Sequence, residues 1–507
     1  MARSVLIIGA GIGGLSAGCY AAMNGYKVRI LESHARPGGL CTSWTRHGYT
    51  FDGCIHNLAG TSPDSGFHGL FEELGVLPAT PLHAYREMVQ VERPDGPPLT
   101  LYTDLDRLEA HMTTLFPRDS AAIKSLIADA RRFARVDIMG LSARPWTDRF
   151  SFLSAIPLMV KYGRFTMDEF AKRFIDPFLR RAFPTLVYDW PQQSMLMLLT
   201  FLGRCSVGDL GWPMGGSGEL ANRIAKRFHD LGGEIRYHAK VQSIIVENGR
   251  AVGVKLADGT EERADIIVSN ANGHTTIFDM LGGRFTNPAI RDYYAHPEDR
   301  IEMGIHVSLG VARDLSDEPH ALILALDKPA EIAGEARDRF YIQLFGFDPR
   351  LAPKGSSVIR VLLPTSYRRW ESLANDDAAY QAEKRRIADA VIAQLETRFP
   401  GIARQIEAVD VATPITTYRF TGNAHGYKTS VVALFLSMIF GRTLSQTLPG
   451  LANFYMVGQW AGGGGVSGAA AMGRNVARAI CEADHRAFVA ATPGDERKPQ
   501  PGVKAAA

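Results

Sequence analysis

The start of the chain alternates between apolar runs and small residues in a pattern that predicts strand, helix and strand. Ser4 to Ile8 (SVLII) is a continuous apolar run typical of a buried strand. The turn GAGIGG follows, and small residues then predict a helix from about Leu15 to Met23. Tyr26 to Leu31 (YKVRIL) alternates as a second strand and leads into Glu32. Together these elements predict a βαβ unit of about 30 residues.

The middle of the chain predicts a helical insertion followed by short strands. From about Ala84 to Cys205 the periodicity is helical, and exposed Arg and Lys are frequent. The helices are expected at 121–136, 167–183 and 192–202, with a further amphipathic helix at 220–231. Short β-branched runs predict strands at 234–237, 241–247, 251–256 and 266–269. The pairs Asn248-Gly249 and Asp258-Gly259 supply the turns between them.

The last third predicts longer strands from about 300 to 364, a helix at 377–398 and a buried strand at 454–457. A glycine cluster and a helix at 468–482 follow that strand. The longest apolar stretch, Val431 to Phe440, falls well short of the roughly 20 residues that a membrane-spanning helix needs. The tail 492–507 is polar and Pro-rich, which predicts disorder.

Composition and charge narrow the class of protein. A chain of 507 residues suggests two or three domains. Lys+Arg 56 against Asp+Glu 53 gives a net charge of +3, which is too small to indicate a nucleic-acid partner. Five cysteines without paired spacing predict reduced thiols and a cytoplasmic location, and no signal peptide fits the N-terminus. The fourteen histidines form no grouping typical of a metal site.

The glycine spacing after the first strand predicts a dinucleotide site. Gly9 permits a tight turn, Gly11 lets the backbone approach a pyrophosphate, and Gly14 lets the helix pack closely on the sheet. The anion is expected at the helix N-terminus, where free N–H groups favour negative charge. Glu32, at the end of the second strand, can accept hydrogen bonds from ribose hydroxyls and would repel a 2′-phosphate.

Two further glycine groups favour FAD over NAD as that dinucleotide. Arg36-Pro37-Gly38-Gly39 brings a cation and two more glycines beside the expected pyrophosphate. Near the other end of the chain, Gly458 closes a strand, and Gly462 to Gly465, Val466, Ser467 and Gly468 open a helix. A glycine-lined helix N-terminus can donate N–H groups to the flavin O2 region of the reduced ring. A linker is the alternative for the glycine run, but it lies between a buried strand and an Ala-rich helix.

Blocks along most of the chain resemble the phytoene desaturase, carotenoid isomerase and retinol saturase family, within the amine-oxidase-like flavoproteins. After GAGIGGLSAG and RPGG come six more blocks. They are FDGCIHNLAG (51–60), WPMGGSGELANRIAKRFHDLGGEIRYHAKVQSI (212–244), RADIIVSNAN (263–272), DPRLAPKG (348–355), TPITTYRFTGNAHGY (413–427) and LPGLANFYMVGQWAGGGGVSGAAAMG (448–473). The blocks are specific for the family and less so for a substrate within it.

The resemblance implies an α/β fold in which a discontinuous, glutathione-reductase-like Rossmann domain binds FAD. That domain would comprise 1–83, 210–285 and 448–491, and 84–209 with 286–447 would form a substrate domain with a mixed sheet and a helical cap. The resemblance also places the backbone of Val241 at the adenine and Val466 near the flavin O2. Gln459 falls where relatives have an acidic or polar residue near the ribityl chain.

The chemistry expected is hydride transfer between flavin N5 and an apolar isoprenoid, polyene or lipid-like substrate, giving desaturation, saturation or isomerisation. No second dinucleotide-binding domain is expected for NAD(P)H, and no C-x-x-C pair exists for dithiol chemistry. The electron acceptor is therefore expected to be oxygen, a quinone or another small molecule. His56, in the segment that approaches the flavin in the wider group, is the candidate proton donor or acceptor because imidazole titrates near neutral pH. Asp52 is expected to be a turn or cap residue.

Two alternative functions stay open. An amine oxidase shares the fold but binds a polar substrate, and the blocks around Asp348 and Thr413 weigh against it. A flavin-free prenyl-lipid binding protein also shares the fold, and the complete glycine motif with Glu32 weighs against that.

The apolar patch Phe152 to Val160, flanked by Arg149, Lys161 and Arg164, has the composition of a peripheral membrane contact. A packed contact between domains would also explain that patch.

Overall fold

Three distant segments of the chain supply the strands of one parallel sheet. The computed structural model describes residues 2–93, 96–143, 153–154, 156–295, 304–423, 445–458 and 464–495. The strand order in this sheet is β19-β13-β1-β2-β9, and every pairing is parallel. The strands are β1 (Ser4–Ile8), β2 (Lys27–Leu31), β9 (Glu234–Arg236), β13 (Ile266–Ser269) and β19 (Phe454–Met456). The carboxyl ends of all five strands therefore meet at one edge, where ligands of such sheets bind.

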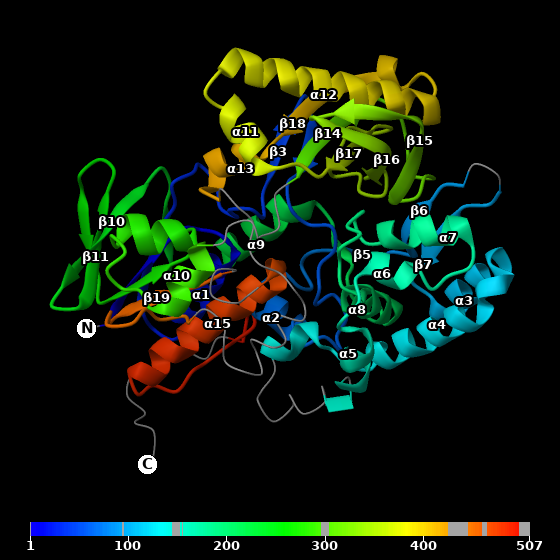
Figure 1. Ribbon diagram of the computed structural model, residues 1–507. Helices are drawn as coiled ribbons and strands as arrows, with labels where there is room; N and C mark the ends of the chain where they lie inside the picture. Colours follow the sequence, from blue (N-terminus) through cyan, green and yellow to red (C-terminus); the bar gives the residue numbers. More distant parts are fainter. Residues whose placement is uncertain are drawn as a thin grey trace.

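The alternation of side chains in β1 buries both faces of this sheet. Val5 and Ile7 join the hydrophobic core that includes helix α1 (Ile12–Met23), whereas Leu6 and Ile8 join a second core with the three-stranded sheet. That antiparallel sheet consists of β10 (Val241–Glu247), β11 (Arg250–Leu256) and β12 (Glu261–Arg263). On the first face, α1 packs against α9 (Gly216–Asp230) and α15 (Gly465–Ala483), as Figure 1 shows.

A seven-stranded mixed sheet forms the second layered unit. Its order is β18-β14-β17-β16-β15-β6-β7, and only the β15–β6 pairing is parallel among the described strands. The strands are β6 (Glu87–Val91), β7 (Leu99–Tyr102), β14 (Ile305–Val311), β15 (Ala321–Ile332), β16 (Glu335–Leu344), β17 (Ser357–Leu363) and β18 (Ile406–Ala412). One face packs under α12 (Asp377–Arg398) and α11 (Tyr367–Leu373), with α13 (Pro414–Thr421) beside them (Figure 1). Residues on the opposite face, including Ile323 and Tyr341, join the core shared with the first segment of the chain.

Short helices form the remaining part, drawn in cyan and blue-green at the right of Figure 1. They are α3 (Leu105–Leu115), α4 (Ser120–Ala134), α5 (Ile156–Tyr162), α6 (Met167–Ala171), α7 (Pro177–Ala182) and α8 (Met195–Ser206). Side chains of Asp104, Thr166, Asp176 and Ser194 cap the N-termini of α3, α6, α7 and α8. The other elements are α2 (His68–Glu73), α10 (Pro288–Ala295), β3 (Ser43–Arg46), β4 (Tyr49–Asp52), β5 (Leu82–His83) and β8 (Trp212–Pro213).

The predicted βαβ unit, the strands at 241–247 and 266–269 and the helix at 377–398 are confirmed. Two predictions in the helical part are wrong. The segment that begins at Ala84 opens with β6 and β7, whose backbones pair with β15 and with each other to complete the mixed sheet before the helices start. The helix expected at 167–183 is two helices, because Pro177 has no N–H to donate and Asp176 caps a new start.

The proposed domain boundaries stay predictions. The run Val431–Phe440 and most of the expected tail lie outside the described residues. In the part of the chain that the structure describes, no helix is long and apolar enough to cross a membrane.

Candidate active site and cofactor-binding residues

The glycine turn after β1 leaves a backbone surface with no side chains over it. Gly9 has a φ of +93°, and its N–H donates to the Leu31 carbonyl at 2.8 Å, which ties the turn to β2. A Cβ on Gly14 would overlap the carbonyl oxygen of Gly9, so only glycine lets α1 begin this close to the strand. Gly11 is the N-cap of α1, and no side chain caps that helix. The first N–H groups of α1 therefore remain available to an anion.

Glu32 lies at the carboxyl end of β2, as predicted, and it also holds the turn. Its Oε2 accepts the N–H of Ala10 at 2.7 Å, and its Oε1 accepts the N–H of His34 at 2.8 Å. Oε1 also accepts Ser33 Oγ at 3.3 Å. A carboxylate oxygen has about two lone-pair sites, so Oε2 can still accept a hydrogen bond from a ribose hydroxyl. The Glu32 carbonyl accepts the N–H of Ala239 at 2.8 Å, which brings the start of β10 at Val241 beside it. Thus the residues predicted for ribose and adenine lie close together.

The second glycine pair meets the first turn, but Arg36 points elsewhere. The N–H of Gly38 donates to the Ala10 carbonyl at 2.8 Å, and Gly38 and Gly39 have φ values of +116° and +61°. Arg36 is exposed, and its Nη1 donates to the carbonyl of Ser43 at 2.7 Å. The guanidinium is thus held by the backbone of β3.

Gly458 and Asn270 complete this glycine surface from the adjacent strands. Val457 N–H donates to Ser269 at 2.9 Å, and Gly458 follows with a φ of +92°. A Cβ on Gly13 would lie 3.0 Å from the Gly458 backbone, so the two segments touch. The Asn270 amide lies between them, and its Nδ2 donates to the Gly9 carbonyl at 3.4 Å. Sequence reasoning missed Asn270, although a polar residue directly after a buried strand at this sheet edge was the available signal.

The helix that follows Gly458 also starts at this edge of the sheet. Gly464 is the N-cap of α15 and no side chain caps the helix, while Val466 in its first turn packs against the main core. Ser467 Oγ donates to the Ala59 carbonyl at 2.6 Å and so joins α15 to the FDGCIHNLAG segment. Gln459 lies outside the described residues. The turn Gly9–Gly14, the pair Gly38–Gly39 and Gly458 thus form a glycine cradle without side chains, and this cradle fits the backbone approach that FAD requires.

His56 is buried in a polar network, and this changes the expectation of its charge. Its Nδ1 lies 3.2 Å from Gln343 Oε1 and 3.4 Å from Arg360 Nη2. Burial, and then the positive charge of Arg360, hold the pKa of His56 well below its ordinary value. The imidazole is therefore neutral near pH 7, and the argument that it titrates there is wrong. A catalytic role for His56 stays a prediction.

Arg360 and Asp52 form the buried ion pair behind His56. The Arg360 side chain is 1% exposed, and its Nη1 lies 3.5 Å from Asp52 Oδ1. Its other N–H groups donate to the carbonyls of Asp52 and Ile55 and to Gln343. Asp52 accepts the Ser217 N–H at 2.6 Å in the first turn of α9, so it is the cap residue expected. An arginine within the apolar strand VIRVLL was the sequence signal for this pair.

The neighbouring His306 provides a test by pH. Burial, with Arg360 second, lowers the pKa of His306 to about 3, whereas an unfolded histidine has a pKa near 6.5. As the pH falls below 6.5, the unfolded state takes up the proton first, so the stability is complete above that pH and is lost below it. We expect His306 alone to account for about 2 kcal/mol of lost stability at pH 5.

Urea unfolding at pH 7 and pH 5 measures this difference. His306→Gln should show a smaller loss than wild type, and the exposed control His485→Gln should lose as much as wild type. An identical loss in His306→Gln and wild type would contradict the assignment.

A pocket opens where the His56 segment meets the mixed sheet and the helical part. Aromatic and aliphatic side chains form much of its wall, including Tyr85, Met88, Leu186, Tyr188, Phe201 and Tyr341. His56, Asn57, His320 and Gln343 add polar groups, and no carboxylate lies among the described lining residues. The Tyr188 ring packs on His56 with 4.5 Å between ring centroids. Such a wall suits a mainly apolar, uncharged ligand.

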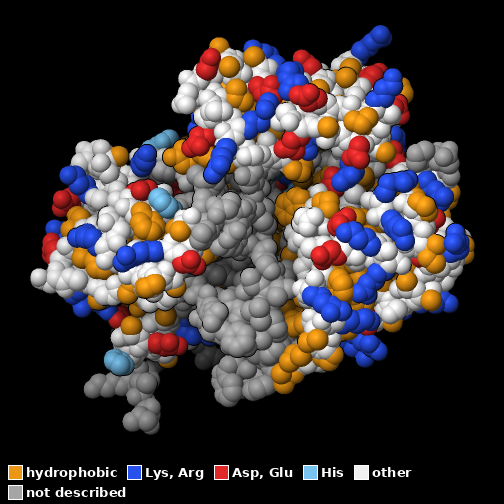
Figure 2. Space-filling model, in the orientation of Figure 1, with side chains coloured by type: hydrophobic (Ala, Val, Ile, Leu, Met, Phe, Trp, Pro, Cys, Tyr) orange, Lys and Arg blue, Asp and Glu red, His pale blue; other side chains and the backbone are white. Residues whose placement is uncertain are grey.

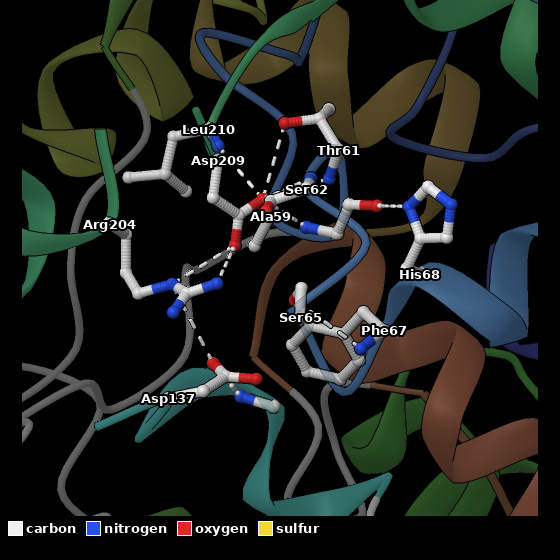
Figure 3. Close-up of polar contacts among 12 residues, drawn as sticks. Ala59, Thr61, Ser62, Ser65, Phe67, His68, Asp137, Arg204, Asp209 and Leu210 are labelled. Carbon is white, nitrogen blue, oxygen red and sulfur yellow. Dashed lines mark hydrogen bonds and ion pairs between the residues drawn. The ribbon is translucent and has the colours of Figure 1, made fainter. Parts of the chain in front are cut away.

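A second buried ion pair fixes the loop that follows His56 (Figure 3). Asp209 Oδ1 accepts the N–H groups of Gly60 and Thr61 at 2.7 and 2.8 Å, and Oδ2 accepts Arg204 Nη2 at 2.9 Å. Burial favours a raised pKa for Asp209, but the hydrogen bonds from Arg204 and the backbone outweigh it, and the pKa lies below its ordinary value. Arg204 belongs to α8, so this pair joins the helical part to the loop that Ser467 contacts from α15.

The cysteines are free, but two of them are neighbours. The Cys41 thiol donates to the Ser217 carbonyl at 3.6 Å, and the nearby Cys54 thiol, together with burial, raises the pKa of Cys41 well above its ordinary value. The sequence spacing did not indicate this contact. Among the described residues, no group of three or more His, Cys, Asp or Glu side chains is placed to hold a metal ion.

Relatives of known name match most of the chain. Prolycopene isomerase, chloroplastic, from Daucus carota is 27% identical over 446 residues, covering 83% of this chain and 71% of its own length. Phytoene desaturase (lycopene-forming) from Pseudescherichia vulneris is 27% identical over 508 residues, covering 95% of this chain and 99% of its own length.

Solved structures share the fold. An oxidoreductase from Methanosarcina mazei has a TM-score of 0.59 at 16% identity, covering 94% of this chain and all of its own. Putrescine oxidase bound to putrescine has a TM-score of 0.56 at 14% identity, covering 95% of this chain and 99% of its own. These likenesses confirm the predicted α/β fold class.

The family described as flavin containing amine oxidoreductase matches residues 12–481. This range runs from the first turn of α1 to the last turn of α15, so it includes Gly14, the Gly38–Gly39 pair, the His56 segment, Gly458 and the whole mixed sheet. The chain belongs to this flavin-containing amine oxidoreductase family and is an FAD-dependent oxidoreductase.

Proposed function

We propose that the protein acts on carbon–carbon bonds of an apolar polyene or isoprenoid substrate, by desaturation, saturation or isomerisation. The observation that carries this proposal is the pocket beside His56, whose wall is mainly aromatic and aliphatic and contains no described carboxylate. The names of the prolycopene isomerase and phytoene desaturase relatives support the same substrate class. An amine oxidase would bind an ammonium group, and the described pocket wall offers no acidic side chain to neutralise one.

FAD supplies a ring that can accept or release a hydride when it is bound. We propose that the residues holding it are Gly9, Gly11, Gly14, Glu32, Arg36, Gly38, Gly39, Val241, Gly458, Gln459 and Val466. The chain's own residues then position the substrate and exclude water from the pocket. Tyr188 packs on His56, and Tyr85 Oη donates to the His56 carbonyl at 3.0 Å, so this wall is held rigidly.

Anaerobic titration of the holoenzyme distinguishes the candidate substrates. A polyene should either bleach the flavin band near 450 nm or reoxidise flavin that has been photoreduced, and benzylamine and putrescine should do neither. Bleaching by an amine, with no response to any polyene, would overturn the proposal. We further propose oxygen, a quinone or another small molecule as the electron acceptor, since the described strands form one fully parallel sheet and no second one that could bind NAD(P)H.

Glu32→Ala tests the proposed cofactor site. It removes the acceptor of the buried Ala10 N–H as well as the ribose hydrogen bonds. We expect FAD affinity to fall roughly thirtyfold, the equivalent of about 2 kcal/mol. Fluorescence titration of the apoprotein with FAD measures this change. Glu234→Ala, which removes an exposed carboxylate from β9, is the control and should bind FAD as wild type does. Wild-type affinity in Glu32→Ala would show that the acid does not contact the cofactor.

We also propose a peripheral membrane contact at α5. The predicted patch is only partly apolar on its outer side, because Leu158 and Met159 are buried, and Phe152 and Arg149 lie outside the described residues. Leu153, Ile156 and Val160 are exposed by 50%, 37% and 75%. In Figure 2, hydrophobic side chains lie at the lower edge of the helical part, below a dense group of Lys and Arg. An apolar strip beside cations suits the surface of an anionic membrane.

Val160→Asp should weaken binding to phosphatidylglycerol vesicles roughly tenfold, because a buried valine contributes about 1.5 kcal/mol. Vesicle flotation measures the bound fraction. Val409→Asp, at another exposed valine on β18, should float as wild type does. Equal binding by Val160→Asp and wild type would contradict the contact.

A further inference from the structure

The pocket beside His56 contains buried polar atoms that no described residue satisfies. Tyr341 and Gln343 are adjacent inward-facing residues of β16, and their exposed fractions are 3% and 4%. The Tyr341 hydroxyl makes no hydrogen bond within the part of the chain that the structure describes. This hydroxyl is not completely enclosed by protein atoms, and Tyr341 lines the pocket, so the hydroxyl opens on the pocket. A tyrosine hydroxyl placed in this way needs a partner from the pocket itself.

The hydrogen bonds behind the pocket determine which groups face it. Gln343 Oε1 accepts Arg360 Nε and Nη2 at 2.9 and 2.6 Å, which fixes the orientation of the amide. Its NH₂ has no hydrogen-bond partner among the described residues. Asn57 Nδ2 donates to Tyr188 Oη at 2.6 Å, so the Tyr188 hydroxyl has its own hydrogen to donate. The pocket therefore offers donors from Tyr341, Tyr188 and Gln343, and the Asn57 carbonyl as an acceptor.

The charges around the pocket indicate a neutral ligand. The cation behind it, Arg360, is paired with Asp52 at 3.5 Å and donates its N–H groups to protein acceptors. His56 is neutral for the reasons given above. Neither a carboxylate nor an ammonium group of a ligand would find an unpaired opposite charge among the described lining residues. A donor-rich, uncharged site surrounded by apolar walls suits a single hydroxyl or carbonyl oxygen.

We propose that this pocket binds a hydroxyl or carbonyl oxygen carried by an otherwise apolar substrate, with Tyr341 as a specificity-determining residue. This inference rests on the proposed polyene or isoprenoid substrate and makes it more specific. A pure hydrocarbon would displace water from these donors without replacing its hydrogen bonds. A site that hydrogen-bonds an oxygen discriminates strongly against the analogue that lacks it, because its buried polar groups are left unpaired.

Four ligands with one polyene skeleton test the proposal: retinol, retinal, retinoic acid and the hydrocarbon axerophthene. Their dissociation constants are measured with the FAD-loaded protein under anaerobic conditions, from the change in flavin absorbance or from tryptophan quenching. We expect retinol and retinal to bind at least about tenfold more tightly than axerophthene. Tyr341→Phe should remove most of this difference while leaving axerophthene binding and FAD content unchanged. Its thermal stability should not fall, because the hydroxyl has no described partner to lose.

Tyr380→Phe is the matched control, since it deletes a tyrosine hydroxyl of α12 that is hydrogen-bonded to Thr413 Oγ1. That variant should keep the preference for retinol. Equal binding of retinol and axerophthene, with no effect of Tyr341→Phe, would mean that only water fills the pocket; the inference would fail while the proposed function stands. Tightest binding of retinoic acid, or loss of FAD from Tyr341→Phe, would also overturn it. If no polyene binds or changes the flavin, the proposed function fails as well.

Discussion

Gly14→Ala should destabilise the protein by more than about 4 kcal/mol and prevent it from retaining FAD. A Cβ at this position would overlap the carbonyl oxygen of Gly9 and lie 3.2 Å from the Asn270 side chain. The Gly9 oxygen belongs to the backbone and Asn270 is packed in the glycine cradle, so neither can rotate away as an exposed side chain could. The overlap is therefore relieved only by moving α1 away from β1. Urea unfolding and the FAD content of the purified protein measure the two effects.

Gly69→Ala is the matched control, since a Cβ there would meet nothing closer than Glu72 at 4.0 Å. In the short helix α2 this change should stabilise the protein by up to about 1 kcal/mol, because alanine has the higher helix propensity. If Gly14→Ala retained wild-type stability and bound FAD normally, the close approach of α1 to the turn would not be required for either.

Asp209→Asn should destabilise the protein by about 3 kcal/mol, because it leaves Arg204 charged and buried without its nearest partner. The exposed fractions of these two side chains are 3% for Arg204 and 1% for Asp209. The asparagine oxygen can still accept the Gly60 and Thr61 N–H groups, so the substitution removes mainly the charge (Figure 3). Urea unfolding measures the loss.

Removing both charges should restore part of this loss. Arg204→Met combined with Asp209→Asn is expected to be more stable than Asp209→Asn alone by at least about 1 kcal/mol. The exposed pair of Lys226 and Asp230 provides the control, and Asp230→Asn should change stability by less than about 0.5 kcal/mol. If the destabilisation in the double variant equalled the sum of the losses in the two single variants, the stability contributed by Arg204 would not depend on Asp209.

Local sequence signals were sufficient for the nucleotide-binding half of the site. Strand, glycine turn and Glu32 lie within one βαβ unit, so spacing alone placed Gly9, Gly14 and Glu32 at one sheet edge. The contact of Gly458 with this turn is long-range: the glycine run at the start of a helix indicated a flavin contact, but spacing alone could not place Gly458 against Gly13. Asn270 lies on the same edge, but its position between two glycine segments depends on the packing of β13 against β1 and β19.

The polar network around His56 was much harder to predict. Arg360 lies more than 300 residues after Asp52 in the chain, and no local pattern links a strand arginine to one particular carboxylate. The lowered pKa of His56 follows from that partner and from burial, which are both properties of the tertiary fold. Similarly, the sequence of β6 and β7 was assigned to the helical region that follows it. These two segments form strands because β6 pairs with β15 of the mixed sheet and β7 pairs with β6.

Product analysis tests the central claim most directly. The FAD-loaded protein is incubated with a polyene or isoprenoid, once with oxidised and once with reduced flavin, and the products are separated and weighed by mass spectrometry. We predict a product that has lost or gained two hydrogens, or an isomer of unchanged mass, with putrescine and benzylamine unaltered. An unchanged polyene under both conditions, together with oxidative deamination of an amine, would contradict the account.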